Sequence, residues 1–193
     1  LHTYERIGVL LVDRQQARFF VYELGVLVDR SELFDELPRD YDHRGERERG
    51  DTQHHVDDLV DQHLRRAAAV AFQAFQDAEY AHLLVGAPAE LAGAVESYLH
   101  PYLTERLGGR LSVPVGASDA ALREAVLEAE DRLVRARETK VVERLREGVG
   151  SGRKAVAGLE AVLQALVERR VDLLVVSVES GLGFDPALKR VAE

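Results

Sequence analysis

The 193-residue sequence contains no cysteine, no methionine and no tryptophan, and only five prolines. The lack of cysteine excludes disulfide bonds and thiolate metal sites, and it fits a reducing compartment, so we expect a cytoplasmic protein. No run approaches the ~20 apolar residues that a membrane-spanning helix needs, and no charged-then-apolar leader opens the sequence. We therefore expect no membrane partner.

Positive charge is also scarce, because 25 lysines and arginines face 34 acidic residues, for a net charge of −9. This balance argues against coating of nucleic acid by bulk electrostatics. We predict no DNA partner, and contact with RNA would have to be local. The sequence begins at Leu1 and contains no methionine, from which we expect a fragment of a longer chain.

What is present is an apolar patterning that predicts an α/β protein with the order β-β-β-α-β-α-β-α, a linker, and then α-β. Short runs rich in Val, Leu and Phe predict strands at 7–13, 17–23, 26–34, 81–86, 110–115 and 171–178. Apolar residues at three- and four-residue steps predict helices at 53–75, 87–107, 118–147 and 155–169. Pro101 should kink or divide the second of these helices.

These elements predict two domains. Residues 1–147 form an α/β domain with a mixed sheet, and residues 148–193 hold a glycine-rich linker at 148–152 and the first part of a second α/β domain. A lone helix and strand cannot bury their own apolar faces, so the second domain is expected to be truncated.

The segment 38–52 (PRDYDHRGERERGDT) is almost entirely polar and predicts a solvated loop without fixed structure in the free protein. Gly45 and Gly50 add backbone freedom, and Asp51 or Thr52 is expected to cap the helix that follows. Its arginines offer bidentate donors to RNA phosphates; they are Arg39, Arg44, Arg47 and Arg49. The interleaved acidic residues cancel most of that field, so a merely solvated loop is an equally good interpretation.

Several acidic and histidine residues invite a metal interpretation. His54 and His55 are spaced to share a helix face with Asp58, but spacing fixes no third ligand. Asp61 and His63 follow on the same helix, and His63 lies beside the apolar stripe, which favours a packed histidine. We therefore predict no metal site.

Two further motifs have a structural explanation that we favour. Asp13 ends the first strand, where a metal-dependent nuclease would place a carboxylate, but its convergence with Asp29 and Glu32 cannot be read from the sequence. A turn-forming aspartate is the better interpretation. The glycine-rich run from Gly148 to Lys154 follows a helix rather than a strand, so we interpret it as a linker and not as a phosphate-binding loop.

Two stretches carry a resemblance to a known family. The first is IGVLLVDRQQARFFVYELGVL, followed by the charged loop, a long helix and AHLLVGAP; the second is GSGRKAVAGLEAVLQALVERRVDLLVVS. Together they resemble the central domain and the start of the third domain of the archaeo-eukaryotic class I peptide-chain release factor and Pelota family, in a bacterial form. The resemblance implies a ribonuclease-H-like fold for the first domain.

In that family, the loop before the long helix carries Gly-Gly-Gln and reaches the peptidyl-transferase centre. The corresponding stretch here, Arg44 to Gln53, has neither a Gly-Gly pair nor Gly-Gly-Gln. Gln53 is the nearest polar side chain that could orient water, and we name it as the candidate catalytic residue.

The resemblance implies a translation-associated factor that acts on the ribosome or peptidyl-tRNA in termination, rescue or a stress response, with hydrolytic activity left open. It implies no cofactor, and a protein partner through the third-domain-like region is a further expectation. Two alternatives stay open, a non-catalytic RNA- or protein-binding adaptor and a metal-dependent nuclease centred on Asp13.

Overall fold

The structure is a computed structural model that describes residues 6–34 and 46–177, with side-chain environments given for 6–31 and 57–177. The chain divides into two compact units, Leu1–Leu133 and Val134–Glu193, and each is described by itself. Over the described ranges, no helix combines the length and the apolar character needed to cross a membrane.

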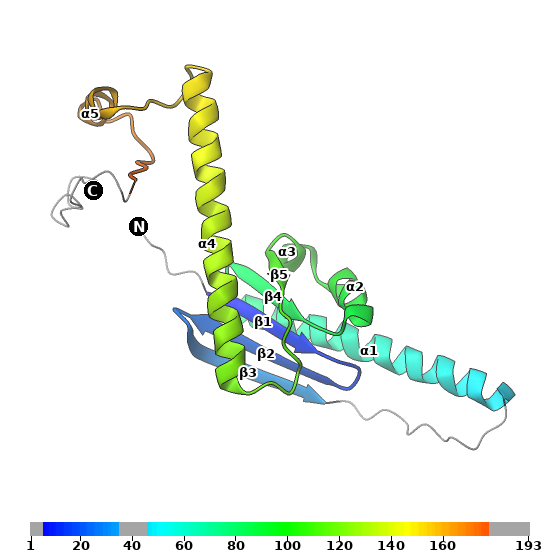
Figure 1. The fold of residues 1–193 in the computed structure, drawn as a ribbon. Helices are drawn as coiled ribbons and strands as arrows, with labels where there is room; N and C mark the ends of the chain where they lie inside the picture. Colours follow the sequence, from blue (N-terminus) through cyan, green and yellow to red (C-terminus); the bar gives the residue numbers. More distant parts are fainter. Residues whose placement is uncertain (1–5, 35–45, 178–193) are drawn as a thin grey trace. The chain divides into compact units, whose positions relative to one another are not determined.

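The first unit is built on a five-stranded mixed sheet (Figure 1). Its strands are β1 (Ile7–Val12), β2 (Gln16–Glu23), β3 (Val26–Phe34), β4 (His82–Gly86) and β5 (Leu107–Arg110). They lie in the order β3-β2-β1-β4-β5. Strand β2 is antiparallel to both β1 and β3, whereas β4 is parallel to β1 and β5 is parallel to β4. The predicted α/β class with a mixed sheet is confirmed.

Helices cover both faces of this sheet. They are α1 (Glu46–Ala78), α2 (Ala89–Tyr98), α3 (Pro101–Thr104) and the first turns of α4 (Asp119–Gly150), whereas α5 (Leu159–Val167) belongs to the second unit. One core cluster packs the α1, α2 and α3 side against strand residues such as Leu10 and Phe19, and the other packs the first turns of α4 against residues such as Leu11 and Phe20. Alternation along β1 and β2 supplies both clusters, because successive strand residues point to opposite faces.

Two tight turns connect the first three strands. The Asp13 carboxylate accepts hydrogen bonds from the backbone N–H groups of Gln15 and Gln16, at 2.8 and 2.7 Å. Leu24 and Gly25 both have positive φ, 56° and 67°, as a two-residue hairpin with the twist of the sheet requires. The predicted meander and the turn-forming role of Asp13 are therefore confirmed.

The apolar stripe expected on α1 and the break at Pro101 are also confirmed. Val60, Leu64, Ala67, Ala68 and Ala71 are buried under the sheet. The predicted helix 87–107 is divided into α2 and α3, and Pro101 occupies the first turn of α3, where its missing N–H costs nothing.

Helix α1 begins earlier than predicted. It starts at Glu46 rather than at residue 53, so residues 46–52 are helical and neither Asp51 nor Thr52 is its cap. Glutamate and arginine are good helix formers, and acidic residues stabilise a helix at its N-terminus. The high density of charged residues therefore did not distinguish a loop from a helix over residues 46–52.

Two predicted strands and the linker also differ. The fifth strand is Leu107–Arg110 rather than 110–115; Leu111 still donates to Val85 O at 2.8 Å, but Pro114 has no N–H with which to continue a ladder. Residues 171–177, within the predicted strand 171–178, form no strand. Helix α4 runs through Gly148 to Gly150, so the first part of the predicted linker is helical. The glycine-rich run therefore continues a helix and does not follow a strand, which agrees with the argument against a phosphate-binding loop.

Candidate functional site

The region between β3 and α1 is where the resemblance places the functional residues. Arg39, Arg44 and Gly45 lie outside the described residues. The other candidates lie in the first turns of α1, where the structure gives the backbone only; they are Arg47, Arg49, Gly50 and Gln53. The structure thus brings Gln53 and two of the four arginines onto one helix.

Described contacts place both ends of this region near the β1–β2 turn. Phe34, the last residue of β3, pairs with Gln16 at the start of β2. On the helical side, the Arg14 guanidinium of the β1–β2 turn lies 3.6 Å from the carboxylate of Asp57 in α1. Both partners of this ion pair are exposed, so it contributes little to stability. Two described residues that flank the region, Phe34 and Asp57, therefore both lie near the β1–β2 turn.

The acidic residues near this edge have structural partners. Asp13 forms the β1–β2 turn, and Asp61 accepts hydrogen bonds from Tyr98 Oη and from Arg65 Nε, the latter at 2.9 Å. The Tyr98 hydrogen bond, followed by Arg65, holds the pKa of Asp61 below its usual value. His63 is buried, as predicted. Within 6–31 and 57–177, no three His, Asp or Glu side chains converge as a metal site would require.

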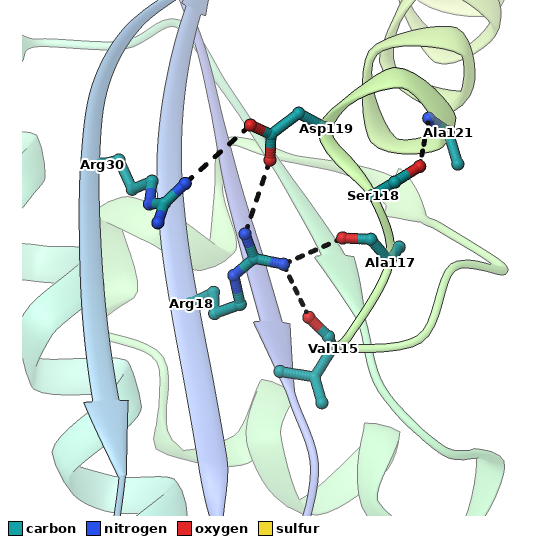
Figure 2. Close-up of polar contacts among 7 residues, drawn as sticks. All are labelled: Arg18, Arg30, Val115, Ala117, Ser118, Asp119 and Ala121. Atoms are coloured by element: carbon teal, nitrogen blue, oxygen red, sulfur yellow. Dashed lines mark hydrogen bonds and ion pairs between the residues drawn. The ribbon is translucent and has the colours of Figure 1, made fainter.

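A second polar cluster joins the sheet to the start of α4 (Figure 2). Arg18, on β2, points its guanidinium at the segment before the helix and donates to Val115 O and Ala117 O, both at 3.0 Å. Its other terminal nitrogen lies 3.5 Å from the Asp119 carboxylate, to which Arg30 of β3 also points at 3.9 Å. Ser118 Oγ accepts from Ala121 N–H at 3.3 Å and caps the helix, as the sequence predicted for Ser118 or Asp119.

The environment of Arg18 explains why this cluster holds. Its side chain is only 16% exposed and lies over the Phe20 ring at 4.8 Å, so water competes weakly for its hydrogen bonds. Burial, followed by the Asp119 charge, raises the pKa of the neighbouring Tyr22, while Arg18 and Arg123 lower it. The arrangement fixes the entry of α4 onto the sheet.

Sequence analysis missed this cluster. The available signal was a single arginine between Ala17 and Phe19 in an otherwise apolar strand. A charged residue in a buried strand indicates that hydrogen-bond partners must be present. Here two of the partners are backbone carbonyls about 100 residues along the chain, and a sequence does not show which backbone carbonyls lie nearby.

Comparisons with known proteins agree with this architecture. Residues 1–131 match the family model described as bacterial archaeo-eukaryotic release factor family 10. A solved structure of an archaeal translation termination factor, aRF1, is similar at 19% identity and a TM-score of 0.50, over 84% of this chain and 46% of its own. Pelota from Archaeoglobus fulgidus is similar at 16% identity and a TM-score of 0.47, over 86% of this chain and 46% of its own. A comparison with curated proteins gives no match.

The likeness to aRF1 concerns the fold, and this chain spans 46% of the length of the archaeal factor. The family match is the stronger result, because residues 1–131 are most of the chain and nearly coincide with the first compact unit, Leu1–Leu133. The mixed sheet, the long α1 and the start of α4 all lie in that stretch. The chain therefore belongs to the bacterial archaeo-eukaryotic release factor family 10.

Proposed function

We propose that this protein is a cytoplasmic translation factor that binds the ribosome or peptidyl-tRNA through the β3–α1 region and acts in termination, rescue or a stress response. The observation that carries the proposal is the family match over residues 1–131. The site that the resemblance assigns to contact with the peptidyl-transferase centre falls within that match. For the third-domain-like region, 148–193, the same proposal includes binding to a protein partner.

We further propose that Gln53 does not hydrolyse peptidyl-tRNA in the manner of Gly-Gly-Gln. That chemistry needs a glycine-rich loop whose backbone amide assists the attack of water. Gln53 instead lies well inside α1, which begins at Glu46. Only the first four N–H groups of an α-helix are free, and the amide of a later residue bonds to the carbonyl four residues before it. This geometry supports a binding factor rather than a hydrolase.

The start of α1 offers local donors to a phosphate rather than a net positive field. Arg47 and Arg49 lie in its first turn beside Glu46 and Glu48, which offset their charge, so attraction comes from the individual guanidinium groups and from the positive end of the helix dipole. The whole chain carries −9, which adds no long-range attraction to an RNA backbone. Binding should therefore be local and strongly salt-dependent.

Co-sedimentation with 70S ribosomes across a salt series tests the binding half of the proposal. The double variant Arg47→Gln, Arg49→Gln should lower the bound fraction and flatten its salt dependence. The matched control Arg132→Gln, Arg135→Gln removes two arginines from the exposed surface of α4 and should leave both unchanged. Absence of binding at low salt would contradict the ribosomal proposal and favour an adaptor with another RNA or protein partner.

A peptidyl-tRNA release assay on the ribosome complex tests the other half. We expect no release above the rate of ribosomes alone, and no change with Gln53→Ala. Release that is lost with Gln53→Ala while binding persists would overturn the non-hydrolytic proposal and assign the chemistry to this residue.

A further inference from the structure

A band of aromatic rings and guanidinium groups runs along α1 where α2 and α3 pack against it, on the face of the sheet opposite α4. We call it the aromatic band; it comprises Arg65, Phe72, Phe75, Tyr98, His100, Tyr102 and Arg106. None of these residues belongs to the β3–α1 site, and the hydrophobic core accounts for only part of the ring surface.

The centre of the band is a stacked pair of rings with a third, tilted ring beside it; we call the three rings the stack. His100 lies 3.9 Å from Phe72, centroid to centroid, with the rings 17° from parallel, and Tyr102 lies 5.2 Å from His100 with a tilt of 31°. The side chain of Tyr102 is 57% exposed, so its outer face is open. The Tyr102 N–H donates to His100 Nδ1 at 3.3 Å, which holds the two residues together. The stack is thus formed before any ligand arrives.

Two cations pack on rings of the band. Arg106 lies 4.8 Å above the Phe75 ring and donates to Tyr102 O at 2.8 Å, and neither contact is with a carboxylate. Arg65 lies 4.7 Å above the Tyr98 ring. The Asp61 carboxylate already accepts from both Arg65 and Tyr98. Positive charge at Arg106 is therefore available to an anionic ligand.

Open aromatic faces beside guanidinium groups are the chemistry of single-stranded nucleic-acid binding. Any of the four bases can stack on an aromatic side chain, while arginine and lysine side chains bind the backbone phosphates. We propose that the aromatic band binds single-stranded RNA, with one base stacked on Tyr102 and an adjacent phosphate at Arg106. The choice of RNA rests on the proposed function in translation; the stacking itself rests on the ring geometry.

The test is fluorescence anisotropy of 5′-fluorescein-labelled rU10 with the full chain at low salt. Tyr102→Ala should weaken binding by about 5-fold to 150-fold, the range of one lost base stack. Tyr102→Phe keeps the ring and should bind within about 2-fold of the parent protein, because the hydroxyl takes no part in stacking. Arg106→Gln should reduce the slope of log K against log salt by about 0.7, the value for one phosphate contact on a single strand.

Leu127→Ala is the matched control, because Leu127 is a similarly exposed apolar residue on α4 and should leave rU10 binding unchanged. Unchanged melting temperatures of all variants exclude unfolding as the cause. Equal binding of rU10 and dT10 supports stacking, which does not read the sugar. Binding of dT10 without rU10, no binding of rU10 by the parent, an inert Tyr102→Ala, or a Tyr102→Phe as weak as alanine each overturns the proposal.

This outcome is separable from the ribosome experiment. Loss of rU10 binding in Tyr102→Ala with no ribosome association by the parent protein would keep the aromatic band and reject the translational function. Ribosome association with no rU10 binding would keep the translational function and reject RNA binding by the aromatic band.

Discussion

Two apolar runs of similar composition, β1 (IGVLLV) and residues 171–177 (VDLLVVS), have different structures. In β1, Val9, Leu10 and Leu11 are completely buried. In residues 171–177 there is no strand, and Leu173 and Leu174 are 54% and 46% exposed. Both runs are rich in the residues that favour strands.

The difference lies in the neighbours. Strand β1 has β2 on one side and β4 on the other, and helices cover both of its faces, so its backbone pairs along both edges and its apolar side chains are buried. The only other element of the second unit between 151 and 177 is α5, which offers no ladder of backbone groups. Strand propensity therefore describes how well a residue fits a pleated surface once that surface exists.

The largest expected effect comes from opening a cavity in β1. Leu10 is completely buried between Phe19 on β2 and Val85 on β4. Leu10→Ala should lower the free energy of unfolding by about 2–5 kcal/mol, since the rigid sheet cannot collapse around the lost methyl groups. Urea denaturation with an unchanged m-value would measure it. A loss below about 1 kcal/mol would mean that β1 is packed no better than the exposed run.

The next effect tests how the sheet holds α4. Arg18→Met keeps the length of the side chain but leaves the carbonyls of Val115 and Ala117 without their donor. We expect a loss of about 2 kcal/mol in chemical denaturation, because hydrogen bonds to a charged group are stronger than neutral ones. Arg30→Met is the control: Arg30 is more exposed, its contact with Asp119 is longer, and it should cost less than about 1 kcal/mol. Equal losses would contradict the central role of Arg18.

A smaller effect compares the same substitution at two glycines. A Cβ at Gly8 in β1 would lie 2.8 Å from Tyr80 Cε2, whereas a Cβ at Gly93 in α2 meets nothing within 4 Å. Gly8→Ala should destabilise the protein by about 1–2 kcal/mol through overpacking. Gly93→Ala should stabilise it by about 0.5–1 kcal/mol, because alanine restricts the unfolded chain and favours helix. Opposite signs in thermal or urea unfolding are the expected result, and a stabilising Gly8→Ala would contradict the tight packing.

These sites also show what the sequence could and could not predict. The period-two and period-3.6 patterns gave the first four strands of the first unit in order and the buried face of α1, because both depend on side chains alone, whereas the fifth strand was placed several residues too late. The start of α1 was missed because charged residues favour solvent and helix equally. The Arg18 cluster was missed because its acceptors are backbone atoms of residues 115 and 117. The β3–α1 location of the candidate site came from the family resemblance and not from periodicity.

The smallest effect is expected in the exposed run, as the counterpart of Leu10→Ala. Leu174→Ala removes the same methyl groups from a side chain that is already 46% exposed and lies outside any strand. Its cost should stay within about 0.5 kcal/mol, as for surface substitutions in general. Hydrogen exchange provides the second measurement: amides of β1 should be protected, while those of 171–177, which have no ladder partner in the described chain, should exchange quickly. A loss approaching that of Leu10→Ala, or strong protection at 171–177, would mean that this run pairs as a strand in solution and that composition alone was sufficient to predict it.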